Sequence, residues 1–426
     1  MPRVVVIGGG WAGCAAALAA KKAGSEVILL ERTDCLLGTG LVGGIFRNNG
    51  RFTAAEEMIA MGGGEMFQLM DQVARHTNVE FPGHKHASLY DVALMEPLVR
   101  RSLLEQGVQL WMMSRVCEVI QTDGRIESVC TETGERVEGD VFIETTGTAG
   151  PQANCRKYGN GCAMCILRCP SWGGRVSIAA KAGVQEMMGR KPDGTFGAMS
   201  GSCKLHKDSV DAAIIAEMNR TGVAVVPIPK EMVHVEKLAI KACQQYALAE
   251  FAENLVLLDT GHVKLMTSFY PLDELRRVPG LENARYEDPY AGGKGNSIRY
   301  LALSPRDDHL KVEGLDNLFC AGEKAGLLVG HTEAICTGVL AGHNAVRRAL
   351  GKPLITIPRT TAVGDAIAFV REQMQTEEGM TKKYTFSGAV YFERMKALGL
   401  YTTDLQTIRQ RVAEAGFQNF FAQEVR

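Results

Sequence analysis

The sequence lacks both a surplus of charge and a long apolar run, and each absence excludes a class of protein. Its 47 lysines and arginines nearly balance 48 aspartates and glutamates, so no global field favours a nucleic acid or a membrane surface. No apolar run approaches the ~20 residues of a membrane span, and no charged and then apolar leader precedes the first predicted strand. We therefore expect a soluble, cytoplasmic protein with no membrane partner.

The first 31 residues have the pattern of a dinucleotide-binding unit. An uninterrupted apolar run at 4–7 predicts a strand buried on both faces of a parallel sheet. Gly8, Gly10 and Gly13 have the spacing G-x-G-x-x-G, which permits a tight turn, close approach of a pyrophosphate and close helix packing. Glu31 ends the second predicted strand, where a carboxylate can accept hydrogen bonds from ribose. The nucleotide-binding residues predicted here are Gly8, Gly10, Trp11, Ala12, Gly13, Glu31 and Arg32.

Two later strands are predicted to complete the same sheet. The strand 141–144 ends in small residues, and the strand 315–320 is followed by glycine and Glu323, so backbone can approach a cofactor closely. The helix beginning near His331 could direct its amino end at the O2 edge of a flavin. No second glycine fingerprint follows a strand, which argues against a reductase with two dinucleotide domains. We therefore predict FAD as the resident cofactor, bound in addition by Gly147, Gly322, Glu323, Gly330, His331 and Thr332.

The order of predicted elements indicates an α/β protein with a doubly wound, parallel, Rossmann-like sheet. Residues 1–150 and 282–361, from the two ends of the chain, are predicted to form one FAD-binding domain. Residues 151–281 are predicted to form an inserted α+β substrate domain, with helices near 208–220 and 231–253. Residues 362–426 are predicted to form a helical carboxyl-terminal segment, with helices at 362–374, 392–397 and 404–415.

Three segments resemble FAD-dependent enzymes of the glucose-inhibited division protein A superfamily, and are most similar to its branch of folate-dependent tRNA uracil methyltransferases. They are 8–31, 278–286 and 317–345, of which the last resembles the most specific signature of the family. His331 stands where that signature has a tyrosine. The resemblance implies FAD and a catalytic cysteine near Cys243, for which a buried, unreactive cysteine is the alternative.

Twelve cysteines are many for a reducing compartment, and four of them lie in one short segment. Cys155, Cys162, Cys165 and Cys169, followed by Pro170, have the spacing C-x6-C-x2-C-x3-C-P, which is similar to part of a ferredoxin-type motif. We predict that they hold a 4Fe–4S cluster. The alternatives are a zinc ion, unliganded cysteines, or a catalytic dithiol of Cys162 and Cys165 that exchanges electrons with the flavin.

Two polar segments are further candidates for ligand contacts. The segment 151–207 carries nine basic residues but only Glu186 and Asp193 as acids. This excess predicts a docking face for an anion, which could be RNA, an acidic electron carrier or a nicotinamide phosphate. The alternative is that these residues compensate the charge of a negatively charged cluster. The pair His84 and His86 follows Pro-Gly and is predicted to lie in a solvated turn rather than at a metal.

Together these features predict a flavin oxidoreductase. NADH or NADPH would deliver hydride to FAD, and the electrons would pass to the cysteine-bound centre or to a bound substrate. The resemblance implies a second hypothesis, methylation of RNA uracil at C5 with methylenetetrahydrofolate. A third hypothesis is a non-catalytic, flavin-bearing RNA-binding factor. A homodimer is compatible with all three.

Overall fold

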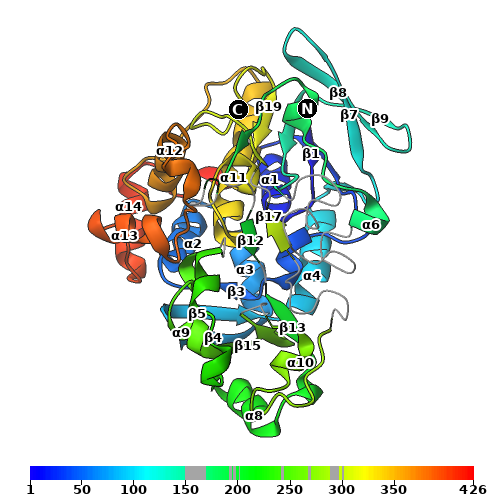
Figure 1. The fold of residues 1–426 in the computed structure, drawn as a ribbon. Helices are drawn as coiled ribbons and strands as arrows, with labels where there is room; N and C mark the ends of the chain where they lie inside the picture. Colours follow the sequence, from blue (N-terminus) through cyan, green and yellow to red (C-terminus); the bar gives the residue numbers. More distant parts are fainter. Residues whose placement is uncertain are drawn as a thin grey trace.

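A computed structural model shows how the chain folds (Figure 1). The structure describes residues 1–148, 169–190, 194, 198–200, 202–240, 244–266, 270–287, 297–299 and 302–426. A parallel sheet and its helices form one half of this part of the chain. Antiparallel sheets form the other half, and the carboxyl-terminal helices lie along one side (Figure 1).

A five-stranded parallel sheet forms the centre of the first half. In spatial order its strands are β19 (Leu318–Cys320), β10 (Val141–Glu144), β1 (Arg3–Ile7), β2 (Glu26–Leu30) and β6 (Gln109–Trp111). Val4, Val5 and Val6 of β1 are fully buried, so the strand predicted from the apolar run is confirmed. The carboxyl ends of β1, β10 and β19 meet at one edge, where parallel α/β sheets bind ligands.

Two helices that are far apart in the sequence pack against each other beside this sheet (Figure 1). They are α1 (Trp11–Lys22) and α11 (His331–Ala349). Glycines make the close approach possible, because a Cβ at Gly338 or Gly342 would lie 2.3 Å from the carbonyl oxygen of Ala12 or Ala16 respectively. This packing brings the start of α11 next to the glycine fingerprint.

The second half contains two antiparallel sheets. One comprises β3 (Ile45–Phe46), β5 (His84–Tyr90) and β4 (Ala74–Phe81), and the other comprises β13 (Cys203–Leu205), β16 (Val263–Leu265), β15 (Asn254–Asp259) and β14 (Val223–Pro227). Ile45 and Leu89 of the first sheet share a hydrophobic core with Val256 and Leu258 of the second. The two sheets therefore form one packed unit, and the predicted domain boundaries stay a prediction.

The remaining strands and helices complete the described part of the chain. The strands are β7 (Val116–Thr122), β8 (Arg125–Thr131) and β9 (Arg136–Glu138) in one antiparallel sheet, β11 (Met187–Met188) with β18 (Ala302–Leu303), and β12 (Ala198–Ser200) with β17 (Ser297–Arg299). The helices are α2 (Gly50–Ala60), α3 (Glu65–Gln72), α4 (Val92–Glu105), α6 (Cys169–Trp172), α7 (Ile178–Lys181), α8 (Ala212–Thr221), α9 (Glu250–Glu253) and α10 (Leu272–Leu275).

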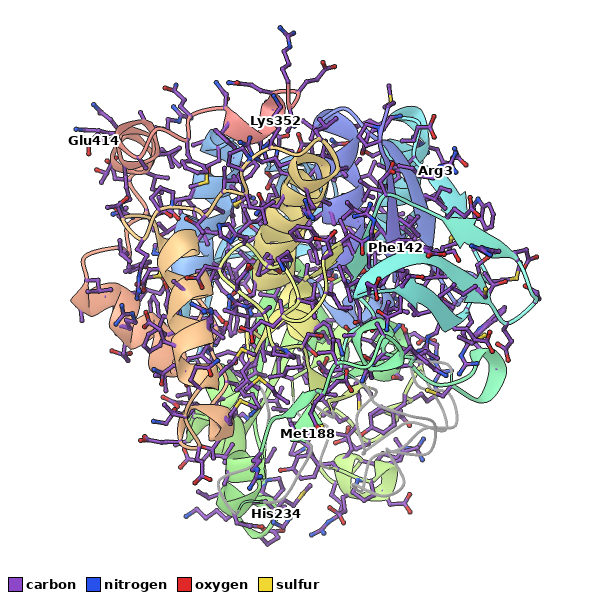
Figure 2. The ribbon with its side chains drawn as sticks, turned by 90° about the horizontal axis from the view of Figure 1, so that it is seen from above. Arg3, Phe142, Met188, His234, Lys352 and Glu414 are labelled. Carbon is purple, nitrogen blue, oxygen red and sulfur yellow. The ribbon has the colours of Figure 1, made fainter. Side chains whose placement is uncertain are left out.

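The carboxyl-terminal segment is helical, as predicted. Its helices are α12 (Ala362–Met374), α13 (Ala389–Ala397) and α14 (Leu405–Glu414). The Thr361 hydroxyl caps α12 by accepting a hydrogen bond of 3.1 Å from the amide of Gly364. Seen from above, Phe142 of β10 lies inside dense side-chain packing, whereas Lys352 and Glu414 project at the edge (Figure 2).

One predicted helix is wrong. The described residues of 231–253 form short 3-10 turns and the four-residue α9 instead of one continuous helix, although α8 occupies the region predicted near 208–220. The backbone at Val233 is extended, and two β-branched valines, Val233 and Val235, weaken helix formation where the chain leaves the turn at 230–232. None of the described helices is both long and apolar enough to cross a bilayer.

Candidate functional site

The glycine turn after β1 has one position that is open to a ligand and two that are packed against the protein. A Cβ at Gly8, whose φ is +107°, would lie 2.6 Å from the Thr145 carbonyl oxygen, and a Cβ at Gly13 would lie 1.8 Å from the Gly8 carbonyl oxygen. A Cβ at Gly10 would meet no protein atom within 4 Å. Gly8 and Gly13 therefore serve the fold, whereas Gly10 exposes backbone to the adjacent cleft.

The start of α1 supplies a site for an anion beside Gly10. Gly10 is the residue that precedes the helix, and no side chain caps it. The first amide groups of α1 therefore keep their hydrogen-bonding capacity, and the helix dipole adds a partial positive charge. A pyrophosphate fits both features.

Glu31 is fixed at the end of β2, on the same cleft. Its carboxylate accepts hydrogen bonds from the Gly9 amide at 2.7 Å, and from the Thr33 amide and hydroxyl at 2.9 and 3.0 Å. Glu31 is only 7% exposed. Since a carboxylate has about four acceptor positions, it can take a further bond from a ribose hydroxyl.

The cleft gathers residues from both ends of the described chain. It is lined by Ile7, Gly8, Gly10, Trp11, Ala12, Leu30, Glu31, Arg32, Thr33, Leu37, Gly38, Thr39, Ser114, Arg115, Val116, Thr145, Thr146, Gly147, Thr148, Arg175, Val176, Ala321, Gly322, Glu323, Gly330, His331 and Ala334. Of the predicted cofactor residues, Gly13 and Thr332 do not line it. Gly13 packs beneath Gly8, and Thr332 is fully buried in the first turn of α11.

A buried ionic cluster supports the floor of the cleft. Glu144, at the end of β10, accepts hydrogen bonds from the amides of Ile178 and Ala179, and its carboxylate lies 3.5 Å from the Lys324 ammonium. Burial acts to raise the pKa of Glu144, but Lys324 and Arg175 bring it below its usual value. Burial lowers the pKa of Lys324 to about 8. The cluster joins β10 to the turn that follows β19.

The segment 173–176 lies against the cleft and is held there by arginines. Arg32 donates to the Gly173 carbonyl oxygen, and Arg115 donates to that of Gly174 at 3.0 Å. The sequence patterns do not point to Arg115 and Arg175. No local pattern identifies them, because they reach the cleft from loop positions that only the fold brings together.

Cys169 is the one member of the predicted cysteine motif within the described residues. Its Sγ lies 4.0 Å from Nη1 of Arg32, beside the cofactor cleft. Cys155, Cys162, Cys165 and Cys243 lie outside the described residues. In the part of the chain that is described, no group of three histidine, cysteine or acidic side chains is arranged to hold a metal. The 4Fe–4S cluster therefore stays a prediction.

Three of the five described basic residues of the segment 151–207 form ion pairs within the protein. Arg175 pairs with Glu186 at 3.6 Å, Lys204 with Glu287 at 3.6 Å, and Lys207 with Asp259 at 2.7 Å. Two of these acids lie far outside the segment in the sequence. Because these two acidic partners lie elsewhere in the sequence, counting charges within the segment overstated its unpaired positive charge. The docking face stays a prediction.

His84 is not in a solvated turn, and that prediction is wrong. It begins β5 and is 2% exposed, with ring contacts to Phe81 and Tyr246 at centroid distances of 4.7 and 4.8 Å. Its Nδ1 lies 3.0 Å from the Asn48 amide nitrogen and its Nε2 lies 3.1 Å from the Gln245 carbonyl oxygen. Burial lowers the pKa of His84 to about 3, so the ring is neutral.

The chain is similar to known proteins of one family. Two solved structures of GidA from Aquifex aeolicus match 99% of this chain, one at a TM-score of 0.70 with 20% identity over 74% of that protein, and one at 0.68 with 18% identity over 78%. The predicted α/β, Rossmann-like fold is thereby confirmed.

A curated relative matches over a shorter stretch. It is the methylenetetrahydrofolate–tRNA-(uracil-5-)-methyltransferase TrmFO of Caldicellulosiruptor bescii, 33% identical over 112 residues. These residues are 26% of this chain and 24%, about a quarter, of the length of the relative. The model of the family described as glucose inhibited division protein A matches residues 3–245 and 244–353. The chain therefore belongs to the glucose inhibited division protein A family.

Proposed function

We propose that the cleft binds FAD and that the protein is an FAD-dependent enzyme of RNA modification. The family and the fold support FAD, and the open backbone at Gly10 is the observation that carries the assignment. The α1 amino terminus would hold the pyrophosphate and Glu31 the ribose. When bound, FAD supplies the capacity to accept and donate hydride.

The reaction that we propose is methylation of a tRNA uracil at C5, with methylenetetrahydrofolate as the carbon donor. The curated relative carries this reaction in its name, and this chain is 33% identical to it over 112 residues. The residues of this chain would orient the cofactor and exclude water. Arg32 and Arg115 hold the segment 173–176 against the cleft, while Glu144 and Lys324 fix its floor.

Incorporation of labelled carbon tests this reaction. Purified protein is incubated with FAD, NADH or NADPH, methylenetetrahydrofolate labelled in its methylene group, and a tRNA transcript that carries no modification. We expect label in 5-methyluridine after digestion and chromatography of the nucleosides. A variant with Gly10→Val serves as the matched control, and we expect no label with it. If the tRNA stays unlabelled after incubation with protein that contains stoichiometric FAD, methylation of this substrate is excluded.

The position of Cys169 favours a second candidate, a flavin oxidoreductase that passes electrons to a cysteine-bound centre. The sulfur lies beside Arg32, which lines the cofactor cleft. In this candidate NADH or NADPH supplies two electrons as hydride to FAD, and the four predicted ligands Cys155, Cys162, Cys165 and Cys169 hold the acceptor cluster. Iron and sulfide analysis of anaerobically purified protein, with Cys169→Ser as control, tests for that cluster.

A further inference from the structure

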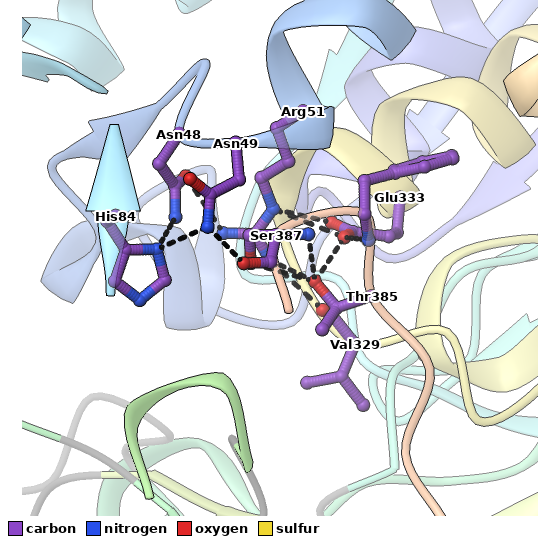
Figure 3. A network of polar contacts seen from close by, with 9 residues as sticks. Asn48, Asn49, Arg51, His84, Val329, Glu333, Thr385 and Ser387 are labelled. Atoms are coloured by element: carbon purple, nitrogen blue, oxygen red, sulfur yellow. Dashed lines mark hydrogen bonds and ion pairs between the residues drawn. The ribbon is translucent and has the colours of Figure 1, made fainter. Parts of the chain in front are cut away.

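Glu333 is a buried carboxylate in the first turn of α11 (Figure 3). Its sequence neighbours Gly330, His331 and Ala334 line the cofactor cleft. The Glu333 side chain is fully buried, and it accepts hydrogen bonds from three donors. Nε of Arg51 donates at 3.1 Å, the Thr385 hydroxyl at 2.6 Å, and the Phe386 amide at 2.9 Å. These hydrogen bonds hold the carboxylate in one position.

Arg51 holds the other side of the same turn. Its Nη2 donates at 3.1 Å to the carbonyl oxygen of Val329, which precedes the cleft-lining Gly330, and also at 3.1 Å to the Thr385 hydroxyl. The Arg51 side chain is 6% exposed. Both charges lie close to Gly330, because a Cβ on that residue would be 2.0 Å from Nη2 of Arg51 and 2.2 Å from Oε2 of Glu333.

The pair is held from three parts of the chain (Figure 3). Asn48 of the segment before α2 contacts both Arg51 and His84. His84 in turn contacts the carbonyl oxygen of Gln245 in the second half of the molecule. Asn49 donates at 2.8 Å to the carbonyl oxygen of Ser387 in the carboxyl-terminal segment. The charges near Gly330 therefore have fixed positions instead of rotating in solvent.

We propose that Glu333 is a positioning residue that neutralises the buried Arg51 guanidinium, and so keeps this charge from raising the reduction potential of FAD in this cleft. The proposal rests on the FAD binding proposed above. Reduction of FAD by two electrons and one proton adds one negative charge to the cofactor. A charge that is fixed against a cleft-lining residue such as Gly330 stabilises or destabilises that added charge according to its sign. With the pair intact, the two opposite charges nearly compensate each other.

Removing one member of the pair tests the sign of its effect on the reduction potential. Glu333→Gln leaves the Arg51 guanidinium, which cannot lose its proton, as an uncompensated positive charge. We expect the potential of bound FAD to rise by about 30 mV, a tenfold change in the equilibrium of a two-electron couple. The double variant Arg51→Gln/Glu333→Gln should return the potential to that of the wild type. The potentials are measured on the flavin-containing protein by anaerobic titration with dithionite and a reference dye.

The pair of Glu57 and Arg411 provides a matched control. Glu57 is also fully buried, accepts hydrogen bonds from the first amides of a helix, here Ala362 and Val363, and lies 3.2 Å from Arg411. Arg51 and Glu333 both lie against the cleft-lining Gly330, whereas Glu57 and Arg411 are not among the nearest neighbours of that glycine. We expect Glu57→Gln to lower the thermal stability of the protein and to leave the potential unchanged.

The outcomes separate this inference from the proposed function. A rise in Glu333→Gln that the double variant abolishes supports the inference. An unchanged or lower potential in Glu333→Gln, a rise that persists in the double variant, or an equal rise in Glu57→Gln overturns it. If Glu333→Gln does not fold, Arg51→Gln provides the second arm, and its potential must be lower than that of the wild type. Wild-type protein without any flavin would instead contradict the proposed function.

Discussion

Two glycines of the same turn should respond in opposite ways to substitution. Gly10 has an extended backbone, with φ of −70° and ψ of −176°, and its Cβ would contact no protein atom. Gly10→Val should therefore cost at most about 1 kcal/mol of folding stability, the order of an unfavourable helix-capping residue. By contrast, Gly13→Ala places a Cβ 1.8 Å from the Gly8 carbonyl oxygen and should disrupt the packing of α1 on β1.

The effect of Gly10→Val on FAD should be far larger than its effect on the fold. A branched side chain there occupies the space that the pyrophosphate needs. Losing two charge-assisted hydrogen bonds, at roughly 1.5–3 kcal/mol each, corresponds to a loss of affinity of about 10²- to 10⁴-fold. We expect the purified variant to be colourless, with a melting temperature close to that of apo wild type. Gly10→Val protein with full flavin occupancy would refute this reasoning, as would a variant that unfolds like Gly13→Ala.

Three further predictions concern acid stability and the cysteine motif. Burial acts to raise the pKa of Asp259, but hydrogen bonds from Lys207, His76 and Arg75 lower it to about 2. The stability that this group contributes is therefore present above about pH 4 and is lost as the pH falls towards 2. Asp259→Asn should lose roughly 2 kcal/mol at pH 7 and become less sensitive to acid in urea unfolding. In the folded protein His84 stays neutral down to about pH 3, whereas in the unfolded chain it takes up a proton near pH 6.5. Folding stability should therefore fall as the pH is lowered from about 6.5 to about 3. A His84→Gln variant whose stability depends on pH in the same way as that of the wild type would contradict this. Cys162→Ser should abolish an iron chromophore and increase proteolysis, and anaerobic wild-type protein with flavin but no iron and sulfide would end the cluster hypothesis.

What the sequence could predict was local in the chain. The turn from Gly8 to Gly13 carries its information within a few residues, because Gly13 packs against the Gly8 carbonyl oxygen and Gly10 leaves the start of the next helix open. The helix predicted at 362–374 is confirmed as α12, and Thr361 caps its start. The fold followed from the order of such units.

What the sequence could not predict depends on contacts between distant segments. His84 looked like part of a polar turn, and only its packing between Phe81 and Tyr246 makes it a buried, neutral side chain. Arg51 pairs with Glu333, 282 positions away, and no spacing rule connects them. Tertiary contacts of this kind override local polarity, so a charged residue at an unremarkable position can become part of the wall behind a cofactor cleft.

The identity of the ligand in the cleft tests the central claim most directly. The protein is purified without added cofactor and denatured with acid. The released ligand is identified by chromatography and mass spectrometry, and its molar amount per chain is measured. We predict FAD at close to one equivalent per chain, with flavin absorbance in the native protein. Recovery of a nicotinamide nucleotide alone, or failure of the apoprotein to take up added FAD, would contradict the account.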